Sequence, residues 1–316
     1  MKISVNIREI DGPWGGGNNF YKSLKFYGHK HGYKIINHLF DNDIDLILIL
    51  CNLKSSSSAS YTVKTGIEYS KTKNIPIIQR VNECDLRKNT SNVDNEIIRI
   101  SEKVNGCIFV SDWLKNDVFK EIKNQNKISI RNGANTEIFK KFKRKKNKTI
   151  KIITHHFSNN LMKGYKYYSE LDKIIGKTDL NQKVEFTLIG NVPKELTFQN
   201  SQIVPLLPIE KIANELNNYD LYITASEYEP GANHVVEALS SGLPIIYLNS
   251  GSMKEYVGEF GLEFEKNNIE KKIREAISSL DYLSTKVYEK YDYSAAVMCN
   301  QYFNFFEKII QKFNAK

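Results

Sequence analysis

Residues Tyr222-Ile-Thr-Ala-Ser-Glu-Tyr-Glu-Pro-Gly-Ala-Asn-His-Val-Val-Glu-Ala-Leu-Ser-Ser-Gly-Leu-Pro-Ile-Ile246 decide the fold of this chain. An apolar strand runs into a Pro-Gly turn, a helix follows, and the helix ends at Ser-Gly-Leu-Pro before a second apolar strand. This order predicts a β-loop-α-β unit. Asn233 is a candidate N-cap residue, so the loop would lead to the backbone N–H groups of a helix N-terminus. Such an end attracts phosphate groups.

Two carboxylates, Glu229 and Glu237, stand eight positions apart in this stretch, one in the loop and one in the early turns of the helix. Two acids at this spacing are, taken alone, more often a solvated helix face than a site. Beside a phosphate site, however, carboxylates are suited to binding hydroxyl groups. A sugar nucleotide offers both partners, because it carries a pyrophosphate together with ribose and hexose hydroxyls.

Around this stretch the whole chain alternates short apolar runs with helical patterns, which predicts parallel α/β sheets. In the first half the predicted strands are 2–7, 33–38, 46–50, 75–79, 106–110 and 127–130, and the predicted helices are 18–31, 61–71, 95–103 and 112–122. The second half restarts the pattern with strands 149–154, 184–189, 203–206, 221–224 and 244–248, and helices 165–175, 209–216, 234–240 and 253–256. A chain of 316 residues exceeds what one hydrophobic core usually organises, so two domains are expected.

The composition narrows the class of protein. No apolar run approaches the ~20 residues of a membrane span, and the N-terminus opens as a strand without the features of a secretory signal. Four scattered cysteines have no metal-ligand spacing and indicate a reduced, cytoplasmic protein. The formal charge of +9 is concentrated at residues 140–148, with seven basic residues in nine. This run is either a solvated interdomain linker or a surface for anionic membrane, at which the protein would be peripheral. No nucleic-acid-binding motif accompanies the charge.

The tract from Ser226 through Glu-Ala-Leu-Ser-Ser-Gly-Leu-Pro-Ile245 resembles the E-x7-E signature of retaining glycosyltransferases of family 4. The resemblance implies a GT-B fold, with two Rossmann-like domains whose parallel sheets face a central cleft. It implies that Glu237 binds the nucleotide ribose and that Glu229 lies beside the transferred sugar. The backbone of Gly231, Ala232 and Asn233 would meet the donor phosphate, although many members have Gly-Phe-Gly where this chain has Pro-Gly-Ala.

A second segment, His155-His156-Phe157-Ser158-Asn159-Asn160-Leu161-Met162-Lys163-Gly164, follows the first strand of the second half. Its Lys-Gly matches the family, in which this lysine contacts the donor pyrophosphate. The family usually has an arginine several residues earlier, and none is present here. Ser158, Asn159 or Arg80 from the first domain are the candidate replacements. The two histidines would suggest metal, but neighbours on a strand point to opposite faces and do not easily share one ion, so no metal site is predicted.

In the first half, Trp14-Gly15-Gly16-Gly17-Asn18-Asn19 follows the first strand and opens the first helix. Glycines let a backbone approach a ligand closely, and the position resembles the Gly-rich first loop of family 4, so Gly16 and Gly17 are predicted to border the donor. A tight structural turn is the alternative. Relatives also carry a histidine near the end of the fourth strand, where this chain has Arg80. We therefore predict a catalytic role for Arg80, against the alternative that it pairs with a surface acid.

These features predict a first domain at 1–145 with a C-terminal helix at 294–316 packed back on it, and a second domain at 146–293. The amphipathic spacing of this last helix would also suit a membrane anchor. The resemblance implies a retaining, metal-independent glycosyltransferase with catalytic residues Glu229, Lys163 and Arg80. No cofactor is expected. The partners would be a nucleotide-diphosphate sugar and a glycan or lipid-linked acceptor. Two other functions stay open: a GT-B epimerase or phosphorylase, and a catalytically silent sugar-nucleotide-binding protein.

Overall fold

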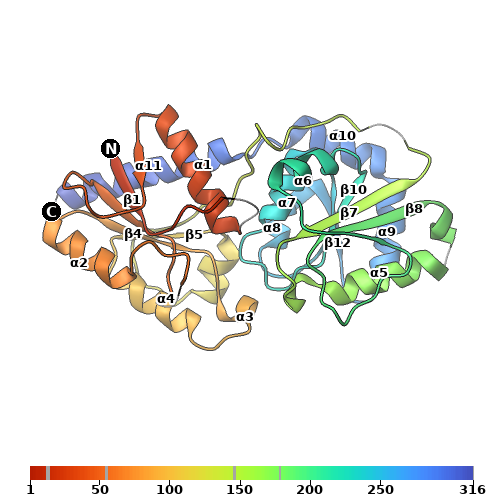
Figure 1. Ribbon diagram of the computed structural model, residues 1–316, viewed down its shortest axis with the longest axis horizontal. Coiled ribbons are helices and arrows are strands. Elements are labelled where there is room, and N and C mark those ends of the chain that lie inside the picture. Colours follow the sequence, from red (N-terminus) through yellow and green to blue (C-terminus); the bar gives the residue numbers. More distant parts are fainter. Residues whose placement is uncertain (12–14, 54–55, 145–146, 178, 316) are drawn as a thin grey trace. The chain divides into compact units, whose positions relative to one another are not determined.

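A computed structural model describes residues 1–11, 15–53, 56–144, 147–177 and 179–315 of the protein. The chain forms two compact units (Figure 1). Unit 1 comprises Met1–Asn132 and Ala295–Lys316, and unit 2 comprises Gly133–Ser294. Trp14 of the glycine loop, Lys145 and Lys146 of the basic run, and Lys316 lie outside the described residues.

Unit 1 contains a six-stranded parallel sheet in the order β2-β1-β3-β4-β5-β6. The central strands are apolar and buried on both faces, as expected where helices cover both sides of a parallel sheet. The strands are β1 (Lys2–Val5), β2 (Lys34–Ile36), β3 (Leu46–Ile49), β4 (Ile77–Val81), β5 (Gly106–Phe109) and β6 (Lys127–Ser129). All six were predicted, with ends that differ by at most two residues.

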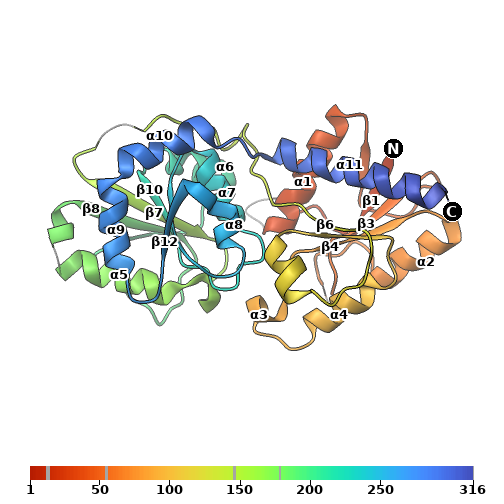
Figure 2. The same ribbon diagram turned by 180° about the vertical axis from the view of Figure 1, so that it is seen from behind.

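Helices cover both faces of this sheet. One layer is formed by α1 (Gly16–Lys30) and α11 (Ala295–Asn314), and the other by α2 (Val63–Lys73) and α4 (Val93–Ser101), with the short α3 (Asp85–Lys88) before α4 (Figures 1 and 2). The apolar stripe of α11 packs into unit 1, where Phe305 and Ile309 approach Gly106 of β5. This stripe is buried, so the alternative of a membrane anchor built on it is wrong.

Unit 2 contains a second six-stranded parallel sheet, in the order β12-β11-β10-β7-β8-β9. One face is covered by α5 (Tyr165–Lys177) and α9 (Ile269–Ser278). The core of the other face contains residues of α6 (Ile209–Leu216), α7 (Asn233–Ser240), α8 (Met253–Val257) and α10 (Leu280–Lys290). The strands are β7 (Ile150–His156), β8 (Val184–Gly190), β9 (Gln202–Val204), β10 (Leu221–Thr224), β11 (Ile245–Leu248) and β12 (Gly261–Phe264).

The basic segment predicted as a solvated interdomain linker is, in its described part, attached to unit 2. Phe139, just before it, is 2% exposed in the unit 2 core. Arg144 pairs with the buried Asp220 at 2.5 Å, and Lys141 donates to the backbone carbonyl of Tyr288. The chain therefore divides between Asn132 and Gly133, whereas the sequence analysis placed the division after residue 145.

Several elements differ from those predicted from the sequence. The helix predicted at 112–122 begins as predicted but ends at residue 118, with a π-helical turn at Leu114–Val118. The Ser111 hydroxyl accepts a hydrogen bond from the Leu114 N–H at 3.1 Å. The edge strand β12 and the helices α3 and α10 were not predicted. Among the described residues, no helix is both long and apolar enough to cross a membrane.

Candidate functional site

The order of strands in unit 2 defines where a ligand is expected. β7 is the first strand of this sheet, and it lies between β8 and β10. From β7 the chain continues outward through β8 and β9 on one side, and through β10, β11 and β12 on the other. The carboxyl ends of β7 and β10 therefore flank a topological switch point, which is where open α/β sheets bind ligands. The predicted residues Ser158, Lys163, Glu229 and Glu237 follow these two strands.

The loop after β7 is held against the loop after β10 by a glycine. Gly164 has a φ of +83°, and a Cβ atom there would lie 2.0 Å from the carbonyl oxygen of Ala225. Beside it, the Glu227 N–H donates to the Met162 carbonyl at 2.8 Å. The Lys-Gly dipeptide is thus a docking point between the two loops, which places Lys163 next to the acidic tract.

Lys163 and Glu229 meet at this point. The ammonium of Lys163 lies 3.3 Å from Oε2 of Glu229, and the two side chains are only 17% and 9% exposed. The sequence analysis named both residues as catalytic, and the structure brings them together. A partly buried lysine suits a phosphate oxygen as a mobile cation, and a carboxylate beside it suits a sugar hydroxyl.

The backbone around Glu229 is held in an unusual conformation. Tyr228 has a φ of +48°, which is rare for a residue with a side chain. The Glu229 carbonyl accepts hydrogen bonds from the backbone N–H and the hydroxyl of Ser252, at 2.9 and 2.8 Å. Gly251 packs directly on the Glu229 backbone, and a Cβ atom at position 251 would lie 2.5 Å from the Glu229 nitrogen. These contacts therefore fix the backbone of Glu229 in the loop.

Glu237 lies on α7 and has a different partner. Its Oε2 lies 2.8 Å from Nε2 of His155, with side chains that are 13% and 8% exposed. His155 in turn contacts Tyr222 of β10, whose hydroxyl accepts a hydrogen bond from the His155 N–H at 3.0 Å. Glu237 was predicted from the sequence, whereas its partner His155 and the neighbouring Tyr222 were not. The signal was available, because His155 and Tyr222 occupy adjacent parallel strands that end at the same edge.

The two neighbouring histidines have different hydrogen-bond partners, although both rings contact His234 of α7, with centroids 6.4 and 5.2 Å apart. His155 faces Glu237, while Nε2 of His156 lies 2.7 Å from the hydroxyl of Tyr168 on α5. Within the described residues, no group of three or more His, Cys, Asp or Glu side chains is arranged to hold a metal ion.

The start of α7 differs in one respect from the prediction. Ala232 is the N-cap residue and makes no side-chain cap hydrogen bond, so Asn233 is the first residue of the helix and not its cap. The Asn233 N–H donates to the Gly231 carbonyl at 3.1 Å in a tight turn. Ala232 is buried, and Gly231 and Asn233 are partly exposed. Donor binding by these three residues stays a prediction.

Ser158 lies in the loop after β7 and is partly exposed. Its hydroxyl accepts a hydrogen bond from the Asn160 N–H at 3.1 Å, and its carbonyl accepts one from the hydroxyl of Tyr165 at 2.9 Å. These contacts shape the loop that carries Lys163. The replacement of the family arginine by Ser158 stays a prediction.

Unit 1 also has a topological switch point, between β1 and β3, and the glycine loop follows β1. Gly15 is the N-cap of α1, which begins at Gly16. A Cβ atom at Gly15 would meet nothing within 4 Å, and one at Gly17 would only touch Ile7 at 3.6 Å. The packing of the described residues therefore does not require glycine at positions 15 and 17. Contact of Gly16 and Gly17 with the donor stays a prediction.

Arg80 is 2% exposed in unit 1. Its guanidinium donates to the Tyr302 hydroxyl at 2.9 Å and to Oδ1 of Asn132 at 2.8 Å, and it stacks 4.2 Å from the ring of Phe20. Through Arg80, β4 is thus linked to α1, to α11 and to Asn132, where the first segment of unit 1 ends. These contacts favour a structural role for Arg80, which differs from both the predicted catalytic role and the alternative of pairing with a surface acid. The catalytic role stays a prediction.

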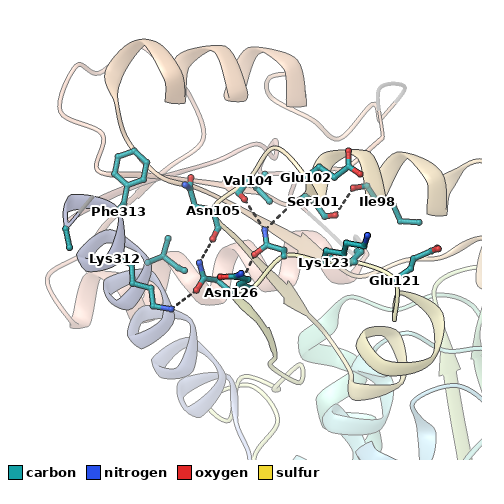
Figure 3. Close-up of a pocket in the computed structure, with 15 residues that line it drawn as sticks. Ile98, Ser101, Glu102, Val104, Asn105, Glu121, Lys123, Asn126, Lys312 and Phe313 are labelled. Carbon is teal, nitrogen blue, oxygen red and sulfur yellow. Dashed lines mark hydrogen bonds between the residues drawn. The ribbon is translucent and has the colours of Figure 1, made fainter.

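A pocket of about 920 Å³ opens at the opposite, amino edge of the unit 1 sheet (Figure 3). It is lined by the C-terminal ends of α4 and α11 and by the residues that precede β5 and β6. Hydrogen bonds link its polar wall, from Lys312 to Asn126 and from Asn126 to the Asn105 carbonyl. None of the predicted site residues lines this pocket.

Comparison with known proteins adds a family match. Residues 157–281 match the family model described as Glycosyl transferases group 1. This segment contains Lys163, Glu229 and Glu237. A sequence comparison with curated proteins found no match.

The fold is shared with solved structures over nearly the whole chain. HepE of Anabaena, in complex with UDP and glucose, has a TM-score of 0.71 at 12% identity, with coverage of 97% of this chain and 99% of that chain. A glycosyltransferase from Rickettsia africae ESF-5 has a TM-score of 0.69 at 14% identity, with 98% of both chains covered. Sucrose-phosphate synthase of Thermosynechococcus elongatus has a TM-score of 0.72 at 12% identity, with 98% and 99% covered. The predicted GT-B fold class is confirmed, and the family match supports a GT-B glycosyltransferase.

Proposed function

We propose that the protein is a retaining glycosyltransferase that moves a sugar from a nucleotide-diphosphate sugar to an acceptor hydroxyl. The observation that carries the proposal is the Lys163–Glu229 pair, which lies beside the switch point within the segment that matches the glycosyltransferase family. Retention of configuration and independence of metal rest on the resemblance of the E-x7-E tract to family 4.

The roles of the residues follow from the charges that change during transfer. As the bond between the sugar and the diphosphate breaks, negative charge grows on the departing phosphate. Lys163 and the backbone at the start of α7 stabilise this charge. Prearranged donors of this kind contribute about 3 kcal/mol each. Glu229 lies beside the transferred sugar, and Glu237 accepts hydrogen bonds from the ribose hydroxyls.

A uridine nucleotide is the first donor to test, because HepE of Anabaena was solved with UDP-glucose. A glycan or a lipid-linked sugar would supply the acceptor hydroxyl. Peripheral contact with an anionic membrane surface and a cytoplasmic location are further parts of the proposal, which rest on the net charge of +9 and on the cysteine usage.

The test is turnover of UDP-, GDP- and ADP-sugars by the full chain with a panel of acceptor glycans. We expect release of the nucleoside diphosphate, a glycosylated product that keeps the donor's anomeric configuration by NMR, and no loss of rate in a metal chelator. Glu237→Gln should weaken donor binding by about 1–3 kcal/mol without unfolding the protein.

The products separate the competing functions. An epimerase would return a changed sugar nucleotide without acceptor. A phosphorylase would require inorganic phosphate, and a silent binding protein would bind a donor without turning it over. Any of these three results would overturn the proposal, and loss of activity in chelator that manganese restores would overturn its metal-independent part.

A further inference from the structure

We propose that His155 is a positioning residue for Glu237, holding one carboxylate oxygen so that the other is presented to the hydroxyls of the donor ribose. This inference rests on the proposed function and adds to it a residue that the E-x7-E pattern does not contain. Three features of the site support this role: the single partner of the carboxylate, the fixed position of the imidazole, and the geometry of its other ring nitrogen.

The first feature is the partner of the carboxylate. Oε2 of Glu237 lies 2.8 Å from Nε2 of His155. Among the residues that the structure describes, His155 is the only hydrogen-bond partner of this carboxylate, so Oε1 is not used by the protein. A partly buried carboxylate can accept further hydrogen bonds at Oε1, and the neighbouring hydroxyls of a ribose are donors of the required kind. A hydrogen bond to one oxygen also restricts rotation of the Glu237 side chain.

The second feature is the position of the imidazole. His155 lies near the end of β7, and its backbone pairs in register with Ile189 of β8. Its N–H donates to the hydroxyl of Tyr222, which belongs to β10 and is fully buried. The rings of His155 and Tyr222 make an edge contact with centroids 5.5 Å apart. Two strands of the sheet therefore hold the imidazole, and through it the side chain of a residue on α7.

The third feature concerns the ring nitrogen that faces away from Glu237. The Tyr222 hydroxyl lies 3.2 Å from Nδ1 of His155 and 3.3 Å from the His155 carbonyl oxygen. When the imidazole is neutral, the hydroxyl donates to Nδ1, which assigns the proton to Nε2. When it is charged, Nδ1–H donates to the hydroxyl, and the hydroxyl donates to the carbonyl. In both states Nε2–H donates to Glu237, so the carboxylate keeps its partner.

The experiment uses the full chain and measures the affinity of UDP, GDP and ADP by calorimetry, together with kcat and the donor KM. His155→Ala removes the donor to Glu237, while His155→Gln places an amide N–H near the position of Nε2. For the diphosphate that the wild type binds, we expect His155→Ala to weaken affinity and raise the donor KM by roughly ten-fold, with kcat changed less than three-fold. His155→Gln should recover most of the loss.

Glu237→Ala provides the background that separates positioning from packing. If His155 acts through Glu237, then adding His155→Ala to Glu237→Ala should cause no further loss of affinity. His156→Ala is the matched control, because this neighbour is equally buried but contacts Tyr168. It should lower the Tm as His155→Ala does, while affinity stays within two-fold of the wild type.

Additive losses in the double variant, or a Gln variant as weak as the Ala variant, would overturn the inference. Each result leaves the proposed function intact if the wild type transfers sugar. If the wild type binds a diphosphate but transfers no sugar, the proposed function is overturned. The affinities of the variants then still test the role of His155. A wild type that binds none of the three diphosphates overturns both.

Discussion

At the scale of single residues, the site depends on a glycine that no other residue can replace. Gly164 combines a φ of +83° with a backbone carbonyl 2.0 Å from where a Cβ atom would lie. Any side chain here is strained by its backbone conformation and also separates the two loops that bring Lys163 to Glu229. The position of Lys163 therefore depends on Gly164, a residue that has no side chain.

Gly164→Ala should destabilise the protein by at least about 2 kcal/mol and reduce donor turnover more than ten-fold, because the Lys163 loop must move away from Ala225. Gly32→Ala is the matched control, since Gly32 has a similar φ of +75° but open space around it. That variant should cost about 1 kcal/mol and leave turnover unchanged. Thermal unfolding and donor kinetics measured on both variants test the prediction, which fails if both lose activity equally.

The site residues could be predicted from the sequence where they belong to a recognisable motif. Glu229, Glu237 and Lys163 belong to spaced patterns, and the structure places the first and third together. His155 was missed because its importance depends on pairing across strands, and a single sequence does not show which side chains meet. For Arg80 the sequence suggested a role that the structure does not favour. Its place at a strand end predicted a ligand contact, but its guanidinium donates hydrogen bonds to Tyr302 and Asn132 inside unit 1.

At the scale of elements, the apolar stripe of α11 forms part of the core of unit 1. Phe303, Phe305, Phe306 and Ile309 are all buried. The helix approaches β5 closely because Gly106 has no side chain, and Phe305 would lie 3.1 Å from a Cβ atom at that position. The C-terminal helix thus packs on a sheet whose six strands all precede residue 130.

Phe306→Ala should lower the free energy of unfolding of unit 1 by about 3–5 kcal/mol, since the ring is fully buried. Val297→Ala, on the same helix but 41% exposed, should change it by less than about 0.5 kcal/mol. Both tryptophans of the sequence, Trp14 and Trp113, precede residue 132, so tryptophan fluorescence in urea reports on unit 1. Equal costs for the two substitutions would show that α11 is not part of this core.

Elements were predictable to the extent that their sequence pattern was strong. Ten of the strands carry apolar runs that the sequence analysis placed within one or two residues at most ends, and Leu221–Thr224 was placed correctly at both ends. β12 was missed because Gly261-Leu-Glu-Phe264 is a short edge strand with a charge inside it. α10 carried a helical pattern in Leu280, Leu283 and Val287 that was not used. At 112–122 the apolar spacing was helical, but the helix ends at residue 118.

At the scale of the whole molecule, the two units differ in how the chain builds them. Unit 2 is one continuous segment, whereas unit 1 needs both ends of the chain. The sequence showed two repeats of an α/β pattern, but it did not show that residues 133–144 belong to unit 2. These residues are attached to unit 2 because Phe139, Lys141 and Arg144 contact residues that are distant in the sequence. Such contacts are not visible in a single sequence, in which the high density of basic residues indicated a linker.

The continuity of unit 2 leads to a prediction about where nucleotide binding resides. The Lys163–Glu229 and His155–Glu237 contacts both lie inside Gly133–Ser294, as do the hydrophobic cores on the two faces of its sheet. A fragment of residues 133–294 should therefore fold cooperatively and bind the nucleoside diphosphate that the full chain binds. Its Kd should lie within about ten-fold of the full chain's, a difference below 1.4 kcal/mol.

The same fragment should not transfer sugar, because the site residues predicted in unit 1, Gly16, Gly17 and Arg80, are absent from it. Calorimetry with UDP, GDP and ADP measures the affinity, and circular dichroism during heating measures folding. The fragment carrying Glu237→Gln is the control, and it should lose affinity by the same factor as the full-length variant. A fragment that unfolds cooperatively yet binds no diphosphate would place essential donor contacts in unit 1, since folding and the two acidic contacts would be intact while binding was lost.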